Sequence, residues 1–404
     1  MIETRFKIEN GYNIPIDWEA IPLNNIGMPC MCKRVLKEDT SLIGDIPFFK
    51  IGTFGRIPDA YISRELFDTL KAKYNYPRKG DILISASGTI GRTVVFDGKE
   101  SYFQDSNIIW LDNSERKVTN KYLNVWLQVI KWATTDGGTI TRLYNKNIAE
   151  SIIVVPPIEE QERIATAFSD INDLIFSMRK LIEKKKNIKQ GVMQDLLSGK
   201  RRLKGFTSQW QKISFSEIYK YASEGGTPST TNRDFYYGGT IPFVKIEDTV
   251  DKYITQTKSF INDLGLKNSS AWLVPKDSII LTNGATIGNV SITKIELSTK
   301  QGILGIILKP EYDVEFMYYT LSSHHFQKEM HQRESGGTFA TVILKSLNTI
   351  EMLIPSSKDE QIAIAKVLSD MDTEIEHLES QLSKYEGIKR GMMQQLLTGK
   401  IRLI

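Results

Sequence analysis

Three histidines are the side chains of this sequence that most invite a catalytic or metal-binding interpretation. His324, His325 and His331 fall in one predicted amphipathic helix, and imidazole nitrogen is a common zinc ligand. A zinc site needs three or four ligands, and no acidic or cysteine cluster accompanies these residues. We therefore expect them to be surface or packing residues, and we expect no metal site.

The two cysteines lead to the same expectation. Cys30 and Cys32 are the only cysteines in the chain, and they are too close together to form a useful disulfide framework. No further cysteine is present to complete a zinc site.

Motifs for enzymatic chemistry are absent from the sequence. There is no G-x-x-x-x-G-K-[ST] loop for ATP, no G-x-G-x-x-G, and no Asn-Pro-Pro-aromatic or Asp-Pro-Pro-Tyr element of a methyltransferase. "SASGTIG" at residues 85–91 is not a G-x-S-x-G nucleophile elbow. We expect no catalytic residue and no cofactor in this chain. A complete nuclease or methyltransferase with undetected motifs is the alternative, and adding S-adenosylmethionine or magnesium to the pure chain with DNA distinguishes the two.

Bulk properties are those of an ordinary globular protein. The chain has 404 residues, 41% of them hydrophobic and 25% charged, which allows two or three domains. No apolar run reaches the ~18 residues of a membrane span, and the first residues lack the apolar segment of a signal peptide. A cytoplasmic location is expected. The net charge of +4 permits a nucleic-acid partner without requiring one.

An internal repeat organises the chain. "GVMQDLLSGKRRL" at residues 191–203 is answered by "GMMQQLLTGKIRL" at residues 391–403, and the match runs back without a gap to Glu159 and Asp359. Upstream the repeat is weaker: "IPFFKI" near Ile46 is echoed by "IPFVKI" near Ile241. One unit is therefore present twice, each time as a variable block followed by a well-matched block.

The well-matched blocks are predicted to be long helices that pair with each other. Their apolar residues alternate steps of four and three, which is a heptad pattern. Pro156 precedes the first helix, and Gly199 and Gly399 follow the last turns. About 40 residues form a rod of roughly 60 Å. Each apolar stripe formed by this pattern could instead belong to a core helix of a globular domain, but two stripes of matching length and phase favour pairing of the helices. The predicted packing positions are Ile164, Phe168, Ile171, Ile175, Met178, Ile182, Ile364, Leu368, Met371, Ile375, Leu378 and Leu382.

The variable blocks are rich in β-branched and aromatic runs separated by glycine and proline, and each has a late helical patch, at residues 120–133 and 315–330. The predicted fold is α+β: two strand-rich α/β domains separated by two long antiparallel helices that form a coiled-coil spacer, with a pseudo-twofold internal repeat. The expected boundaries are 1–155 for the first domain, 156–203 for the first helical spacer, 204–354 for the second domain and 355–404 for the second spacer.

This organisation resembles the specificity subunit of a type I restriction–modification enzyme. The motifs that carry the resemblance span essentially the whole chain. They are "PPIEEQERIA" (156–165), "MQDLLSGK" (193–200), "GGTPSTTN" (225–232), "DEQIAIAKVLSDMD" (359–372) and "MQQLLTGK" (393–400). One departure lies in the first domain, where "IGMPCM" (26–31) stands in place of "GGTPST".

The resemblance implies a non-catalytic function. Each variable block would be a target recognition domain for one half of a bipartite, asymmetric sequence in double-stranded DNA, and the helices would space the halves. The subunit would hold two modification subunits, which methylate adenine with S-adenosylmethionine. It would also hold restriction subunits, which use ATP and magnesium to translocate and cut DNA. Two alternatives stay open: a recognition subunit whose methylase and nuclease are fused in one partner, and a structural coiled-coil adaptor.

Candidate DNA contacts lie at strand ends and in glycine-rich loops that recur in both halves. Hydroxyl, amide and cationic side chains suit phosphates and base edges. Solvated lysines and plain hairpin turns are the competing interpretation. The candidates are Lys50, Thr89, Arg92, Thr139, Thr141, Arg142, Tyr144 and Lys146 in the first half, and Gly225, Gly226, Thr227, Arg233, Lys245, Thr286, Asn289, Thr338, Thr341 and Lys345 in the second.

Overall fold

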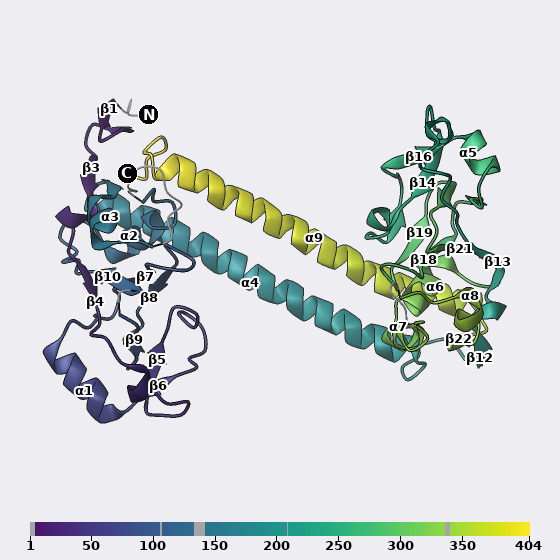
Figure 1. The fold of residues 1–404 in the computed structure, drawn as a ribbon, viewed down its shortest axis with the longest axis horizontal. Coiled ribbons are helices and arrows are strands. Elements are labelled where there is room, and N and C mark those ends of the chain that lie inside the picture. Colours follow the sequence, from purple (N-terminus) through teal and green to yellow (C-terminus); the bar gives the residue numbers. More distant parts are fainter. Residues whose placement is uncertain (1–4, 106, 133–141, 208, 336–339) are drawn as a thin grey trace. The chain divides into compact units, whose positions relative to one another are not determined.

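The computed structural model describes residues 5–105, 107–132, 142–207, 209–335 and 340–404 (Figure 1). They form two compact units, residues 1–179 with 381–404 and residues 180–380. Each unit contains one variable block and a part of each long helix. The boundaries expected from the sequence separate blocks from helices instead, and they stay a prediction. Among the described residues, no helix is long and apolar enough to cross a membrane.

The first unit is strand-rich, with short helices. Its main sheet has the strand order β4-β10-β7-β8, and a second, three-stranded sheet has the order β6-β5-β9. The elements are β1 (Phe6–Glu9), β2 (Tyr12–Pro15), β3 (Glu19–Pro22), β4 (Pro29–Met31), β5 (Ile46–Phe49), β6 (Tyr61–Ile62), α1 (Arg64–Lys73), β7 (Ile82–Ser85), β8 (Thr93–Val95), β9 (Tyr102–Phe103), β10 (Ile108–Leu111), α2 (Asn120–Trp126), α3 (Asn145–Glu150), β11 (Ile152–Val155) and the start of α4 (Ile158–Leu197).

The second unit repeats this plan with larger sheets, ordered β13-β21-β18-β19-β15 and β16-β14-β20-β17. The elements are β12 (Trp210–Ser214), β13 (Tyr219–Glu224), β14 (Ile241–Val244), β15 (Tyr253–Ile254), β16 (Ser259–Ile261), α5 (Asp263–Lys267), β17 (Leu273–Val274), β18 (Ile279–Thr282), β19 (Val290–Thr293), β20 (Leu297–Thr299), β21 (Ile303–Leu308), α6 (Val314–Leu321), α7 (His324–His331), α8 (Leu344–Leu347), β22 (Glu351–Pro355) and the start of α9 (Lys358–Leu396).

Strand pairing shows that the two units are built alike. The "IPFFKI" strand β5 pairs in parallel with β9, and the "IPFVKI" strand β14 pairs in parallel with β20. The last strand before each long helix pairs antiparallel with a strand near the start of its domain: β11 with β3, and β22 with β12. The weak upstream sequence repeat therefore corresponds to a shared topology.

The long helices complete the core of each unit. In the first, Ile164 and Phe168 near the start of α4 join a buried cluster with Leu396 at the end of α9. In the second, Ile364 and Leu368 near the start of α9 join a cluster with Leu196 at the end of α4. Of the predicted stripe positions, Met371, Leu378 and Leu382 are half-buried and the others are buried. The heptad stripe therefore packs partly along the other helix and partly into the domain core.

The helices pack antiparallel. In the first unit Arg179 pairs with Glu386 at 2.6 Å, and in the second Lys185 pairs with Glu374 at 2.6 Å. As residue numbers increase along α4, the residue numbers of the partners on α9 decrease, as in an antiparallel pair. Exposed ion pairs add only about 0–1 kcal/mol each, so they align the helices more than they stabilise them. The predicted fold class is confirmed.

The predicted helical patches of the variable blocks differ in detail. The first is helical only over α2, and the second is split into α6 and α7. Ser323 is the N-cap of α7, where its side chain accepts a hydrogen bond from the Phe326 amide. A serine favours such a cap over a helix interior, and this accounts for the break.

A buried carboxylate ties the start of α4 to the segment that follows α9. Glu160 is 2% exposed and accepts hydrogen bonds from Arg402 Nη2 at 2.7 Å, Trp18 Nε1 at 3.1 Å and the Leu403 amide at 3.0 Å. Arg402 also binds Asp17 and lies over the Trp18 ring. The Arg402 guanidinium holds the pKa of the Asp17 carboxyl below its ordinary value.

The same arrangement recurs in the second unit. Glu360 is fully buried and accepts from Arg202 Nε at 2.9 Å and Nη2 at 2.6 Å, with Trp210 Nε1 at 3.3 Å. We call Glu160–Arg402–Trp18 and Glu360–Arg202–Trp210 the two latches. They account for the repeated Glu-Gln pairs and Gly-Lys-x-Arg-Leu endings of the sequence.

The glutamine after each latch carboxylate fastens the domain to its helix. Gln161 accepts from the Thr119 amide at 2.9 Å and donates to the Pro156 carbonyl at 2.8 Å. Gln361 accepts from the Asp313 amide at 2.8 Å and donates to the Pro355 carbonyl at 3.1 Å. The two amides belong to the N-caps of α2 and α6, and the two proline carbonyls precede the long helices. Each glutamine therefore fixes the direction in which its helix leaves the domain.

Replacing the latch arginine is expected to destabilise the first unit. Arg402→Met leaves the Glu160 carboxylate buried without its cation, and such a change costs about 3–5 kcal/mol. Urea unfolding of the full chain, followed by tryptophan fluorescence, should show an earlier transition for this variant.

Lys400→Met is the matched control, because Lys400 is exposed and lies two residues from the latch arginine. It should change stability by no more than about 0.5 kcal/mol. Adding Glu160→Gln to Arg402→Met should recover much of the loss, since no charge then stays buried. Equal stability of Arg402→Met and the parent chain would contradict the role of the latch.

Candidate nucleic-acid interface

The turn between two adjacent antiparallel strands, β7 and β8 or β18 and β19, recurs in both units and is closed in the same way. In the first unit the Arg92 amide donates to Ser85 Oγ at 2.9 Å. In the second the Asn289 amide donates to Thr282 Oγ1 at 2.9 Å. Gly288 has a φ of +100°, a left-handed conformation that favours glycine. We call residues 86–92 and 283–289 the recognition turns.

A second loop runs beside each recognition turn. The Leu143 amide donates to the Ala86 carbonyl, and the Val342 amide donates to the Asn283 carbonyl, both at 2.8 Å. The predicted candidates Arg142 and Thr341 therefore stand next to their turns, as the bridges from Ser87 to Arg142 and from Gly284 to Thr341 also show. Thr139, Thr141 and Thr338 lie outside the described residues.

In the second unit a third loop joins this cluster. Asn283 Nδ2 donates to the Val342 carbonyl at 3.0 Å and also to the Glu224 carboxylate, which directly precedes Gly225. Asn283 and Glu224 are residues that the sequence analysis missed. The signal for Asn283 was its place in the "TNG" turn, where an amide side chain can bind neighbouring backbone.

The paired glycines of this third loop serve close packing. A side chain at Gly225 would meet the Thr299 carbonyl oxygen at 1.8 Å, and one at Gly226 would meet the Ser270 backbone at 2.6 Å. The Gly225 amide is bonded to the Ile303 carbonyl. These glycines place the exposed Thr227 and Arg233 on the surface beyond them.

Four predicted contacts have side chains that interact with other groups of the same chain, and for Lys50 and Lys146 this interaction lies at the surface. Arg92 donates to the Ile51 carbonyl at 3.0 Å and lies over the Phe54 ring, so it braces two loops. Asn289 Nδ2 donates to Thr249 Oγ1 at 3.1 Å. Lys50 pairs with Asp59 at 3.1 Å, and Lys146 lies 3.9 Å from Glu150.

The remaining described candidates are accessible to solvent. Tyr144 is 65% exposed and precedes α3. Lys245 and Arg142 are half-buried, and Thr341 is half-buried with its hydroxyl 3.0 Å from Ser335 Oγ. Four further candidates are exposed: Thr89, Thr227, Thr286 and Lys345. Each unit thus presents a cluster of hydroxyl and cationic groups on loops, with different side chains in the two clusters.

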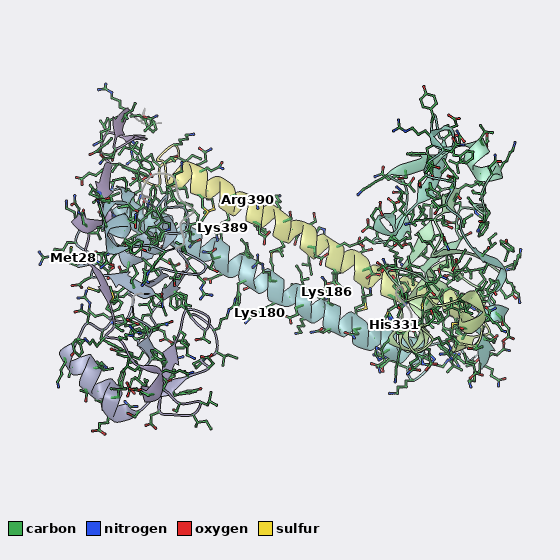
Figure 2. All side chains as sticks on the ribbon, viewed as in Figure 1. Met28, Lys180, Lys186, His331, Lys389 and Arg390 are labelled. Atoms are coloured by element: carbon green, nitrogen blue, oxygen red, sulfur yellow. The ribbon has the colours of Figure 1, made fainter. Side chains whose placement is uncertain are left out.

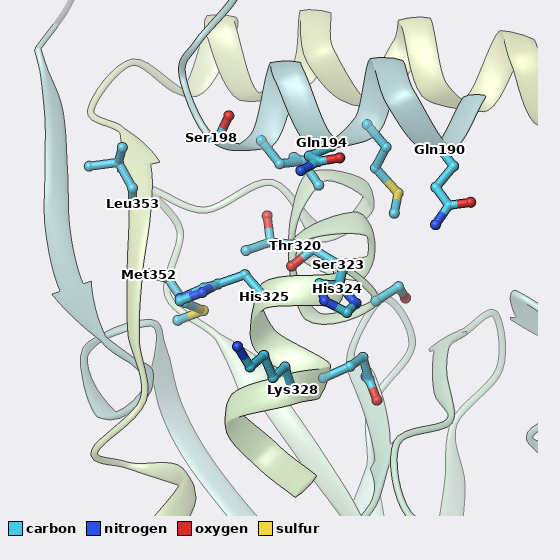
Figure 3. Close-up of a pocket in the computed structure, with 14 residues that line it drawn as sticks. Gln190, Gln194, Ser198, Thr320, Ser323, His324, His325, Lys328, Met352 and Leu353 are labelled. Atoms are coloured by element: carbon cyan, nitrogen blue, oxygen red, sulfur yellow. The ribbon is translucent and has the colours of Figure 1, made fainter. Parts of the chain in front are cut away.

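Two of the three histidines, His324 and His325, line a groove between α4 and α7 (Figure 3). His325 Nε2 lies 3.1 Å from the Glu351 carbonyl, and His331 is paired with Glu334. Among the described residues, no three His, Cys, Asp or Glu side chains gather as a metal site would require. Burial raises the pKa of the Cys32 thiol to about 12, so this cysteine is not a reactive thiolate.

The sequence is similar to those of known DNA specificity subunits. The sequence model of the type I restriction modification DNA specificity domain matches residues 15–189 and 207–384. A putative type I restriction enzyme specificity subunit of Haemophilus influenzae is 57% identical over 160 residues, which is 40% of this chain and 42% of that protein. The putative MjaX specificity subunit of Methanocaldococcus jannaschii is 26% identical over 99% of this chain and 97% of its own length.

Solved structures share the fold at low identity. The crystal structure of a type I restriction-modification S subunit from M. genitalium covers 97% of this chain and 98% of its own, with a TM-score of 0.57 and 17% identity. The HsdS subunit from Thermoanaerobacter tengcongensis has a TM-score of 0.52 with 15% identity, and covers 97% of this chain and all of its own. The chain carries the family's specificity domain twice, and it therefore belongs to the family of type I restriction–modification specificity subunits, the non-catalytic components that direct such enzymes to DNA sequences.

Proposed function

We propose that each domain recognises one half of a bipartite, asymmetric DNA target and that α4 and α9 set the gap between the halves. The observation that carries this proposal is that the same cluster of loops occurs in both units, with different side chains in each. The first cluster has Arg142 and the exposed Tyr144 where the second has Thr341 and the exposed Ile343. A shared scaffold with different contact groups suits two different half-sites.

The partners follow from the same repeat. The matched helices offer similar faces twice, so we propose that two modification subunits bind one chain and that restriction subunits join them, in the cytoplasm. S-adenosylmethionine, ATP and magnesium would bind those partners. Mass measurement of the assembled methylase should then give two modification subunits for each specificity chain.

Exposed cations at the loop cluster should contribute directly to DNA binding. Arg233→Ala is expected to weaken binding of the assembled methylase to its target by about 1–3 kcal/mol if the guanidinium contacts a base. Methylation should become less selective in one half-site only. Arg333→Ala is the matched control, because Glu329 and Thr349 hold that guanidinium within the domain. Its DNA affinity should stay within about 0.5 kcal/mol of the parent. Equal losses in both variants would argue against a role for Arg233 at the interface.

Exchange of the first domain should change one half-site. Residues before Pro156 are replaced with the equivalent block of a relative, and methylated adenines are mapped in cells that carry the system. One half-site should change while the other stays the same, because the second loop cluster is untouched. The parent chain in the same cells is the control. Simultaneous change of both half-sites would contradict separate recognition by two domains.

Lengthening both helices should widen the unread gap. Four residues inserted after Leu181 and four after Leu382 keep the ion pairs Arg179–Glu386 and Lys185–Glu374 on either side of the insertions. Each insertion adds ~6 Å and turns a helix by about 40° beyond one full turn. B-DNA rises ~3.4 Å for each base pair, so the gap should grow by about one or two base pairs. Full methylation activity with an unchanged gap would remove the helices from the spacing role.

A further inference from the structure

A second groove, in the first unit, lies where α2, α4 and α9 meet, and it is rich in cations. Its volume is about 480 Å³. It is lined by Gln128, Asn172, Ile175, Phe176, Arg179, Glu386, Lys389, Arg390 and Met393. Arg179 is paired with Glu386, which leaves Lys389 and Arg390 as an excess of two positive charges. Figure 2 labels both residues on α9.

The second unit has a groove that includes the α4 positions equivalent to Arg390 and Met393. Comparing the two grooves shows how the charges of the first differ. Met193 lines that groove as Met393 lines this one, and Gln190 stands where Arg390 stands. Lys189, the counterpart of Lys389, is neutralised by an ion pair with Asp372. At these two positions of the long helix the repeat is therefore uncharged or neutralised, and the lysine that lines the second groove, Lys328, comes from α7 instead (Figure 3).

In the first unit the neutralising carboxylate is missing. The position that corresponds to Asp372 is Asn172, which lines the groove but carries no charge. No described carboxylate forms an ion pair with Lys389 or Arg390, and Arg390 is exposed. Two unneutralised cations on one face of a helix attract an anionic partner.

Each groove borders its recognition turn. In the second unit Gln327 lines the groove and donates to the Gly288 carbonyl at 3.0 Å. In the first unit Gln128 lines the groove, and Trp132, four residues further along the chain and beyond the end of α2, lies against Gly91 of the recognition turn. The segment that lines the cationic groove at Gln128 therefore leads within four residues to the turn that the proposed function assigns to DNA.

We propose that Lys389 and Arg390 bind phosphates of the DNA beside the half-site recognised by the first domain, in the unread gap. This inference rests on the proposed function. Phosphate contacts are independent of base identity, so they add affinity and hold the duplex along the helices without adding to the recognised sequence. In the second unit the equivalent helix positions, Lys189 and Gln190, do not offer this pair of unneutralised cations.

The test uses the full chain assembled with its modification subunits. Binding of a duplex that carries the mapped target is measured by fluorescence anisotropy over a range of KCl concentrations. The double variant Lys389→Ala/Arg390→Ala should bind roughly tenfold or more weakly at ~0.15 M salt, and the slope of log K against log salt should fall in magnitude by about 1.8. The methylated sequence should not change. Lys389→Arg with Arg390→Lys should retain both the affinity and the slope.

Two matched variants test whether the effect on DNA binding is specific to the groove or follows from any charge on the long helices. Lys184→Ala removes an exposed cation two residues after the buried Ile182, hence on the opposite side of α4, and should leave the slope unchanged. Gln190→Arg places the Arg390 charge in the second unit and should strengthen binding and steepen the slope. A thermal melt by circular dichroism checks that each variant is folded.

The outcomes distinguish this inference from the proposed function. If the parent assembly shows no preference for its target, the proposed function fails. If the parent binds its target and the double variant keeps the same affinity and slope, the phosphate contacts are refuted. Loss of a modification subunit from the double variant would show instead that the groove binds an acidic protein surface, and would also overturn the inference.

Discussion

The buried carboxylate at the first turn of each long helix is the interaction on which the rest of the structure depends. Glu160 and Glu360 are almost completely shielded from water, so each requires the arginine that reaches it from the end of the other helix. A buried pair of this kind contributes little net stability but is costly to break, which favours a single arrangement. Each latch thereby joins segments about 240 or 160 positions apart and holds the start of one long helix beside the end of the other.

The scaffold and the contact surface use different chemistry, and this explains how one architecture accommodates two targets. Recognition turns are closed by backbone amides and by hydroxyls of strand residues, Ser85 and Thr282. Exposed positions such as Thr89 and Thr286 take no part in that closure with their side chains. Under the proposed function, substitution at these positions would change what the surface binds without changing how the turn is built.

Much of the fold was predictable because the apolar residues of the sequence are periodic and the sequence contains an internal repeat. The heptad stripe, the prolines before it and the glycines after it define α4 and α9 almost to the residue. Contacts between distant segments were not predictable, because spacing along the chain carries no information about them. Arg92 is a residue type typical of DNA contacts, yet it donates to the Ile51 carbonyl. Lys389 lies in one groove with Asn172, far from it in sequence, where the repeat has Asp372.

The composition of the first unit also constrains the order in which the protein acquires its structure during synthesis. Residues 180–380 form a continuous segment, whereas the first unit needs residues 381–404 to complete its core. At about 5–20 residues per second, the ribosome adds those residues roughly 10–40 s after residue 179. During that interval Glu160 lacks Arg402, and Phe168 lacks Leu396. The domain translated first is thus the last to be finished, and a nascent chain that terminates early retains an incomplete core for chaperones or proteases to detect.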